Sequence, residues 1–69
     1  MVVDPAVLVA RRHALRLRQT DLAALAGVSE RFVRQLEAGK PSVRLDVLTK
    51  VLDTLGMELV LRLRTGEHP

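Results

Sequence analysis

Two short stretches with helical spacing stand on either side of Gly27, and this pairing constrains the fold more than any other feature of the chain. The first, about residues 19–26, ends at that glycine, a residue that frequently follows a helix C-terminus. The second, about residues 30–37, follows Ser29, whose hydroxyl can accept a hydrogen bond from the exposed amides of a first helical turn. The apolar residues at helical spacing in the two stretches are Leu22, Ala23, Ala26, Val33 and Leu36. The sequence therefore predicts two brief helices joined by a three-residue turn.

Two further helical stretches flank this pair. Asp4 followed by Pro5 is typical of an N-cap and a first helical residue, and predicts a helix over about residues 5–15. Another is predicted over about residues 45–55, where leucines repeat along one face and Gly56 follows. The leucines of these two stretches are Leu8, Leu15, Leu45, Leu48, Leu52 and Leu55. Two short helices joined by a tight glycine-containing turn form the helix-turn-helix arrangement, whose second helix lies in the DNA major groove.

After Gly56 the apolar spacing changes from helical to alternating, which predicts a strand over about residues 57–64. The apolar residues on one face of this strand are Met57, Leu59, Leu61 and Leu63. No other stretch of the chain has strand spacing, so we expect the partner to be the same strand of a second subunit, paired antiparallel about a two-fold axis. The four apolar residues are then the predicted dimer interface. A short polar tail, residues 65–69, follows.

The chain is basic and short. Its 69 residues permit one small domain, residues 1–69, with a core so limited that a second copy is the expected source of added stability. Nine of its eleven cationic residues are Arg and the net charge is +3, which favours nucleic acid as the partner. There is no cysteine, no membrane-spanning apolar run and no signal-peptide pattern, so we expect a cytoplasmic protein with no membrane partner.

The sequence contains no motif for catalysis or for metal binding. The chain has no Cys, Tyr or Trp, and its two histidines, His13 and His68, are far apart in sequence with no further ligands at metal-binding spacing. We therefore expect that the protein is not an enzyme and has no catalytic residues. We also expect that it binds no metal, cofactor or small-molecule substrate.

The spacing of the central residues is specific enough to carry a family resemblance. The matching residues are Gln19, Thr20, Asp21, Leu22, Ala23, Ala26, Gly27, Val28, Ser29, Val33, Leu36, Glu37, Ala38 and Gly39. This pattern resembles the helix-turn-helix of Cro and phage-repressor-like (Xre) regulators, over about residues 5–56. The resemblance implies an all-α fold: a four- to five-helix lambda-repressor-like domain with a C-terminal strand that pairs with a second subunit.

Three further runs, residues 31–41, 43–46 and 52–56 leading into the strand, resemble one branch of that family, the HipB-like antitoxins. This second resemblance implies a homodimeric repressor of a palindromic operator that regulates its own operon. It also implies the antitoxin role of a type II toxin–antitoxin pair, in which the protein binds a HipA-type Ser/Thr kinase toxin. The alternative is a stand-alone phage-repressor-like regulator with no toxin partner, which accounts less well for the apolar strand.

Two residues depart from the family pattern just before the helix predicted over 19–26. Arg16 stands where many members have Gly, so we expect a positive φ at this residue. Arg18 stands where many members have a Ser or Thr cap, and its side chain cannot accept a hydrogen bond from the helix amides. The backbone and the cap at the start of this helix are therefore expected to differ from those of most family members.

The predicted DNA-reading residues lie on the outward face of the helix over 30–37. Arg31 can bond the O6 and N7 atoms of guanine, and Gln35 can pair with N6 and N7 of adenine. Glu30 and Arg34 share this face, and the alternative is that the two arginines and Glu30 form only a solvated charged surface. The alternative is as strong as the DNA-contacting interpretation for Arg34.

Phosphate contacts are expected around this reading face. Gln19 matches a family position that bonds phosphate, and the helix start where it lies is an anion site in its own right. Ser29, which directly precedes the reading helix, is a further predicted DNA-contacting residue. Arg18, Lys40 and Arg44 flank it in loops, where each can neutralise phosphates, although solvated surface charge is an almost equal alternative.

The remaining side chains of note are interpreted as structural. Arg12 falls on the apolar face of the first helix, so its guanidinium needs a buried partner, and Glu37 is the obvious carboxylate. We therefore predict a structural ion pair between these two. Phe32 is expected to pack in the core. Arg62 and Arg64 are either edge charges that discourage aggregation or contacts for an acidic toxin surface.

Overall fold

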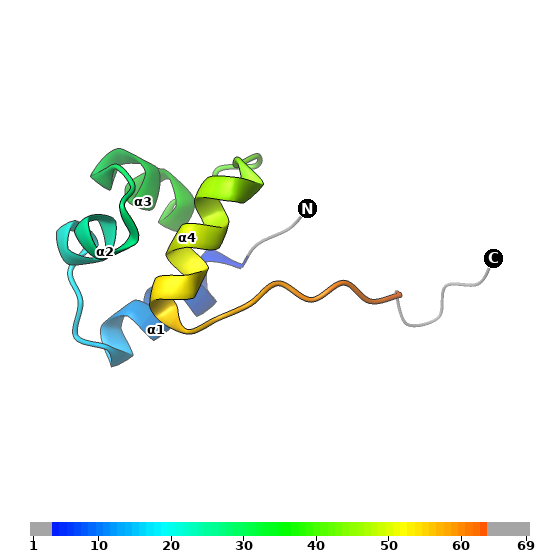
Figure 1. Cartoon of the computed structure of the whole chain (residues 1–69), viewed down its shortest axis with the longest axis horizontal. Helices are drawn as coiled ribbons and strands as arrows, with labels where there is room; N and C mark the ends of the chain where they lie inside the picture. Colours follow the sequence, from blue (N-terminus) through cyan, green and yellow to red (C-terminus); the bar gives the residue numbers. More distant parts are fainter. Residues whose placement is uncertain (1–3, 64–69) are drawn as a thin grey trace.

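The computed structural model describes residues 4–63, which form four α-helices joined by short loops (Figure 1). The helices are α1, Pro5–Ala14; α2, Gln19–Ala26; α3, Glu30–Glu37; and α4, Leu45–Leu55. The bounds of α2, α3 and α4 coincide with the predicted ones, and α1 ends one residue earlier than predicted. None of these helices combines the length and hydrophobicity needed to cross a membrane.

The helix ends follow from the residues that flank them. The Asp4 carboxylate accepts a hydrogen bond of 3.0 Å from the backbone N–H of Ala6, and caps α1. Ser29 Oγ accepts one of 3.0 Å from the N–H of Phe32, and caps α3. Gly27, at φ 70°, ends α2 in the left-handed conformation that glycine adopts without strain. The capping and terminating residues from which the helix ends were predicted are thus the ones that form those ends.

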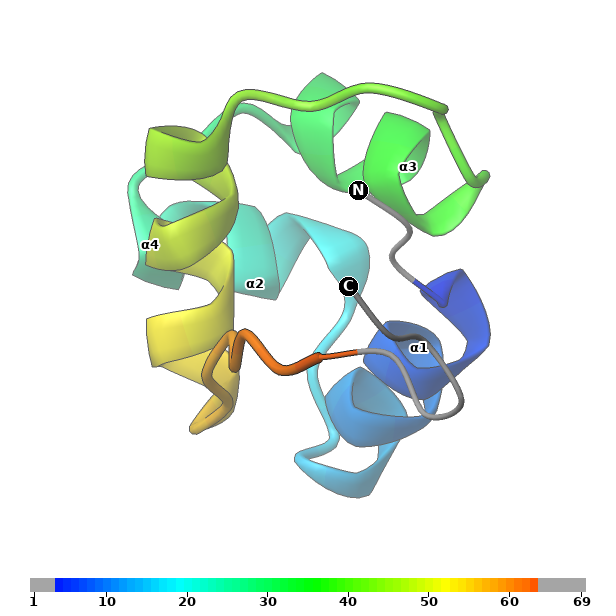
Figure 2. The same ribbon diagram turned by 90° about the vertical axis from the view of Figure 1, so that its right-hand side faces the viewer.

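The four helices surround one interior (Figure 2), in which α2 packs against both α3 and α4, and α1 packs against α3. The buried apolar residues are Leu8, Leu22, Ala23, Val33, Leu36, Leu48, Val51, Leu52 and Leu55. Phe32 is half-buried and packs against this core, in the predicted location.

Two leucines expected on the inner faces are not in the core. Leu45, the first residue of α4, is 56% exposed. Leu15 is 39% exposed, because α1 has already ended when the chain reaches it. Val51 takes a fully buried place that the leucine repeat did not indicate.

The strand predicted over about residues 57–64 is absent from the part of the chain that the structure describes. Met57 packs against the core, but the residues from there to Leu63 run as an extended segment away from the helices (Figure 1). A strand requires a neighbour to complete its hydrogen bonds, and one copy of this chain offers none within residues 4–63. The apolar side chains remain in solvent, with Leu61 99% and Leu63 91% exposed. Arg64, the tail at 65–69 and His68 lie outside the described residues.

Candidate nucleic-acid interface

The turn between α2 and α3 sets which face of α3 is exposed. The N–H of Val28 donates to the carbonyl of Ala23 over 3.0 Å, which holds the turn against the end of α2. Val33 and Leu36 are then buried in the core, at 0% and 4% exposure. The opposite face of α3 carries the four predicted readers: Arg31 and Arg34 are exposed, whereas Glu30 and Gln35 are half-buried.

Arg31 is the reader whose side chain is not already engaged. Its guanidinium forms no hydrogen bond or ion pair with any other residue in the described range 4–63. All five N–H donors are therefore available to a ligand that approaches α3. This is the arrangement that bidentate recognition of a guanine edge requires.

Arg34 and Glu30, in contrast, pair with each other along the helix. Arg34 Nη1 lies 3.0 Å from Glu30 Oε1, at the i,i+4 spacing. Both side chains remain about half exposed, at 57% and 42%. The pair favours the interpretation of Arg34 as part of a solvated charged surface.

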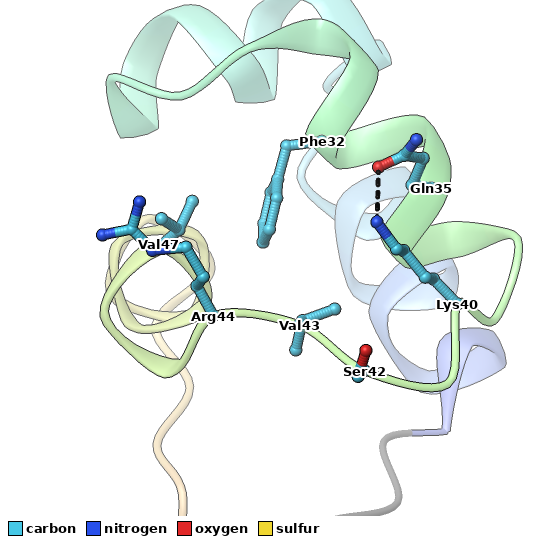
Figure 3. A pocket seen from close by; sticks show the side chains of 7 residues that line it. All are labelled: Phe32, Gln35, Lys40, Ser42, Val43, Arg44 and Val47. Atoms are coloured by element: carbon cyan, nitrogen blue, oxygen red, sulfur yellow. Dashed lines mark hydrogen bonds between the residues drawn. The ribbon is translucent and has the colours of Figure 1, made fainter.

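The far end of α3 faces a pocket next to the loop that leads to α4 (Figure 3). Lys40 Nζ reaches back over 3.4 Å to Gln35 Oε1, and Arg44 pairs with Asp46 at 2.7 Å. This hydrogen bond with Arg44 holds the pKa of Asp46 below its usual value. The seven residues that line the pocket are Phe32, Gln35, Lys40, Ser42, Val43, Arg44 and Val47.

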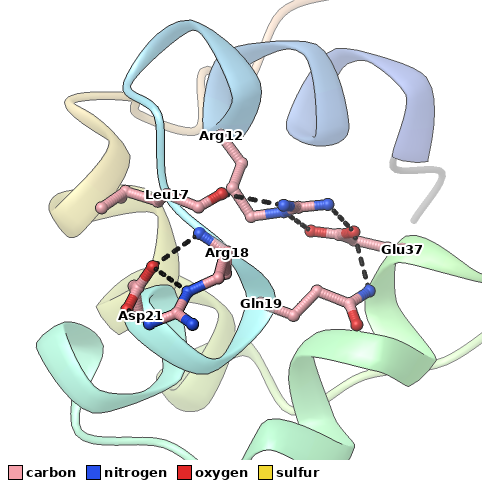
Figure 4. A network of polar contacts seen from close by, with 6 residues as sticks. All are labelled: Arg12, Leu17, Arg18, Gln19, Asp21 and Glu37. Atoms are coloured by element: carbon pink, nitrogen blue, oxygen red, sulfur yellow. Dashed lines mark hydrogen bonds and ion pairs between the residues drawn. The ribbon is translucent and has the colours of Figure 1, made fainter.

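The start of α2 compensates for its unusual cap. Arg18 offers no side-chain acceptor, and Asp21 instead accepts a 2.8 Å hydrogen bond from the backbone N–H of Arg18 and pairs with its guanidinium at 3.1 Å (Figure 4). These bonds, led by the guanidinium contact, hold the pKa of Asp21 below its usual value. Arg16 has the predicted positive φ, 58°. The positive φ at Arg16 and the absence of a side-chain cap from Arg18 are therefore both present, as expected.

Arg12 and Glu37 form the predicted ion pair beneath the interface (Figure 4). Arg12 Nε and Nη2 donate to Glu37 Oε2 and Oε1 over 2.6 and 2.9 Å, and Arg12 Nη1 donates to the carbonyl of Leu17 over 2.9 Å. The two side chains are 10% and 7% exposed. The pair joins α1 to α3 with the bidentate geometry that makes such contacts strong.

Glu37 also receives a third donor that the sequence did not indicate. Gln19 Nε2 donates to Glu37 Oε1 over 3.0 Å, so the expected phosphate-binding residue is oriented by the buried carboxylate (Figure 4). Burial acts to raise the pKa of Glu37, but the hydrogen bonds from Arg12 and Gln19 and the Arg12 charge outweigh it, so the pKa lies below its usual value. The second amide hydrogen of Gln19 has no partner within residues 4–63.

A further contact that the sequence did not indicate fixes the end of α4. Arg11 Nε donates to the carbonyl of Leu55 over 2.8 Å, so a cation on α1 satisfies one of the unpaired carbonyls at the C-terminus of α4. The two residues are 44 positions apart. The spacing of residues within one helix cannot predict a contact between two helices.

Comparison with known proteins agrees with this geometry. The model of the family described as "Helix-turn-helix" matches residues 8–61, which include all of α2, α3 and α4. The chain belongs to the helix-turn-helix family. A helix-turn-helix relative from Sinorhizobium fredii (strain NBRC 101917 / NGR234), "Uncharacterized HTH-type transcriptional regulator y4mF", is 46% identical over 57 residues, 83% of this chain and 74% of the relative.

Membership of the helix-turn-helix family settles the broad class of the protein. It is a DNA-binding transcriptional regulator of the Xre type, and the expectation that it is no enzyme is confirmed by the family. The expected all-α helix-turn-helix fold is likewise confirmed. The match begins within α1, includes α2, α3 and α4, and reaches into the extended segment after Gly56.

Proposed function

We propose that this helix-turn-helix protein is a repressor that reads a specific double-stranded operator through α3, with Arg31 as the principal base-reading residue. The observation that carries the proposal is that the Arg31 guanidinium, on the exposed face of α3, has no partner among residues 4–63, whereas Arg34 is paired with Glu30. Gln35 is the second proposed reader. Glu30 and Arg34 act as a charged pair at the margin of the contact.

The proposed phosphate contacts surround α3. Gln19, Ser29 and Arg18 lie at the starts of α2 and α3, where unpaired backbone N–H groups favour anions. Lys40 and Arg44 are exposed beyond the end of α3. Arg18 pairs with the half-buried Asp21 and Arg44 with the exposed Asp46, and the exposed sides of both guanidinium groups keep donors for phosphate. The proposal keeps the cytoplasmic location expected from the sequence.

The repressor is proposed to act as a homodimer. The residues that support this are Leu59, Leu61 and Leu63, whose side chains are exposed, together with Met57, which begins the same alternating apolar face and packs against the core. Antiparallel pairing of this segment with its copy would supply the missing strand hydrogen bonds and bury that face. A two-fold dimer presents its reading helices about 34–36 Å apart, which fits a palindromic operator.

We further propose an antitoxin role, in which the dimer regulates its own operon and binds a HipA-type Ser/Thr kinase toxin. The support is the resemblance of residues 31–41, 43–46 and 52–56 to HipB-like antitoxins, together with the apolar segment that follows. The alternative, a stand-alone regulator, retains every DNA contact and lacks the toxin.

Fluorescence titration tests the repressor proposal. Labelled DNA from upstream of the gene and a scrambled duplex are titrated with protein at two salt concentrations. We expect selective, salt-sensitive binding, and Arg31→Ala should lose about 1 to 3 kcal/mol of discrimination. Lys50→Ala removes an exposed cation from α4, outside the proposed contacts, and should keep the selectivity. Equal, weak binding of both duplexes by the unchanged protein would contradict the proposal.

The toxin role is tested separately, with the product of the adjacent gene. Co-expression should rescue cells from a neighbouring kinase toxin, and the two proteins should co-elute in size-exclusion chromatography. Normal operator binding by a protein whose neighbouring gene product is no kinase and does not co-elute would support the stand-alone alternative.

A further inference from the structure

The C-terminus of α3 brings Lys40 close to Gln35. Gly39, at φ 84°, lies in the left-handed region just past the helix, and its N–H donates to the carbonyl of Leu36 over 3.2 Å. The N–H of Lys40 donates to the carbonyl of Gln35 over 3.1 Å. These two bonds form a Schellman motif, which brings the residue after the left-handed position back over the last turn of the helix.

In this motif the two side chains that meet are usually apolar, but here they are an ammonium and an amide. Lys40 Nζ lies 3.4 Å from Gln35 Oε1, as Figure 3 shows at the edge of the pocket. An ammonium group can only donate, so it selects the oxygen of the amide and turns Nε2 away from itself. Within residues 4–63 Lys40 is the one side chain that forms a hydrogen bond with this amide.

We propose that Lys40 is a positioning residue for base readout, which orients the Gln35 amide so that Nε2 is presented as a donor to the major-groove edge of the operator. The inference rests on the proposed function and goes beyond it, because Lys40 would then contribute to sequence selectivity without touching a base. Nε2 presents its two hydrogens toward an acceptor such as purine N7, and the second lone pair of Oε1 stays available to adenine N6.

The alternative is that Lys40 makes only the phosphate contact proposed above and does not orient Gln35. A phosphate contact strengthens binding to every sequence alike, whereas an oriented amide strengthens binding to the operator only. The two roles therefore differ in the ratio of operator affinity to scrambled-DNA affinity, and in whether the effects of changing Lys40 and Gln35 are independent.

A double-mutant cycle on DNA binding separates these roles. Lys40→Met keeps most of the aliphatic stem and removes the donor, Gln35→Ala removes the amide, and Lys50→Met is the matched control for a lost charge. We expect Lys40→Met to lower the operator-to-scrambled affinity ratio about threefold or more, Gln35→Ala to do the same, and the double variant to add little. Equal losses on both duplexes, with effects that multiply in the double variant, would overturn the proposal.

A second measurement needs no DNA and tests the orientation directly. The side-chain amide of Gln35 is followed by ¹⁵N relaxation in the free protein. We expect an ordered amide that becomes mobile in Lys40→Met and is unchanged in Lys50→Met. An amide equally mobile in all three proteins would refute the positioning role. If the unchanged protein fails to select its operator, the proposed function falls, while this measurement still decides whether Lys40 orients Gln35.

Discussion

At the scale of single residues, the Glu37 carboxylate is the charged group on which stability is expected to depend most. It is almost fully buried and receives donors from Arg12 and Gln19. Glu37→Ala should lower the free energy of unfolding by about 3 to 5 kcal/mol, because it leaves the Arg12 guanidinium buried without its partner. Urea unfolding followed by circular dichroism measures this. Glu30→Ala removes a half-exposed ion pair from the same helix, should change stability by no more than about 1 kcal/mol, and serves as the control.

The same carboxylate makes stability depend on pH. Because the pKa of Glu37 is lower in the folded protein than in the unfolded chain, the folded state favours the charged form. The stabilisation is therefore complete above the unfolded pKa, about 4.3, and is lost as the pH falls through the lower folded value. Glu37→Gln should be less stable at neutral pH and should lose less stability on acidification. Parallel acid titration curves for the two proteins would contradict this assignment.

At the scale of elements, the loop between α1 and α2 contains the strained position of the backbone. Arg16 holds φ 58° without the freedom of glycine. Arg16→Gly should therefore raise the free energy of unfolding by about 1 kcal/mol. Thermal unfolding measured by calorimetry tests the change, and an unchanged or lower Tm would argue against strain at this residue.

A substitution at Gly27 tests the opposite change, from glycine to a residue with a Cβ atom. Gly27 has φ 70°, and a Cβ added there would meet no heavy atom within 4 Å, so Gly27→Ala introduces backbone strain without a steric clash. We expect a destabilisation of about 1 kcal/mol, similar in size to the gain at Arg16 and opposite in sign. Retained stability in Gly27→Ala would show that the left-handed conformation is tolerated in these turns.

The elements show how far the sequence predicts the structure. Local chemistry such as the Ser29 cap and the Gly27 terminus acts over a few residues, so the bounds of α2 and α3 were predictable. The inward face of α3 and the Arg12–Glu37 pair also followed, because a charged residue on an apolar face needs a partner. The Gln19–Glu37 and Lys40–Gln35 contacts did not follow, since they depend on how packed helices and a helix terminus place side chains in space.

At the scale of the whole molecule, the C-terminal segment is where sequence and structure give different answers. Alternating spacing predicted a strand after Gly56, and the described single chain leaves this segment extended and solvated. The spacing describes what the segment can pair with, whereas a strand exists only when the partner is present. The proposed dimer would supply that partner.

This segment yields the prediction at molecular scale. Leu61→Arg places a charge in the middle of the proposed interface and should convert dimers to monomers in sedimentation velocity. Leu25→Arg alters an α2 residue that is 65% exposed and lies outside this interface, and should leave the dimer intact. An undisturbed dimer in Leu61→Arg would place the interface elsewhere on the surface.

The position of Glu37 has a consequence for genetic experiments on this regulator. One carboxylate on α3 holds Arg12 on α1 and Gln19 on α2, so three elements depend on a residue with almost no surface of its own. A screen for colonies that have lost repression should therefore return Glu37 and Arg12 alleles beside Arg31 alleles. Immunoblots would divide them into two groups: scarce protein for the ion pair, and normal amounts for the reading face.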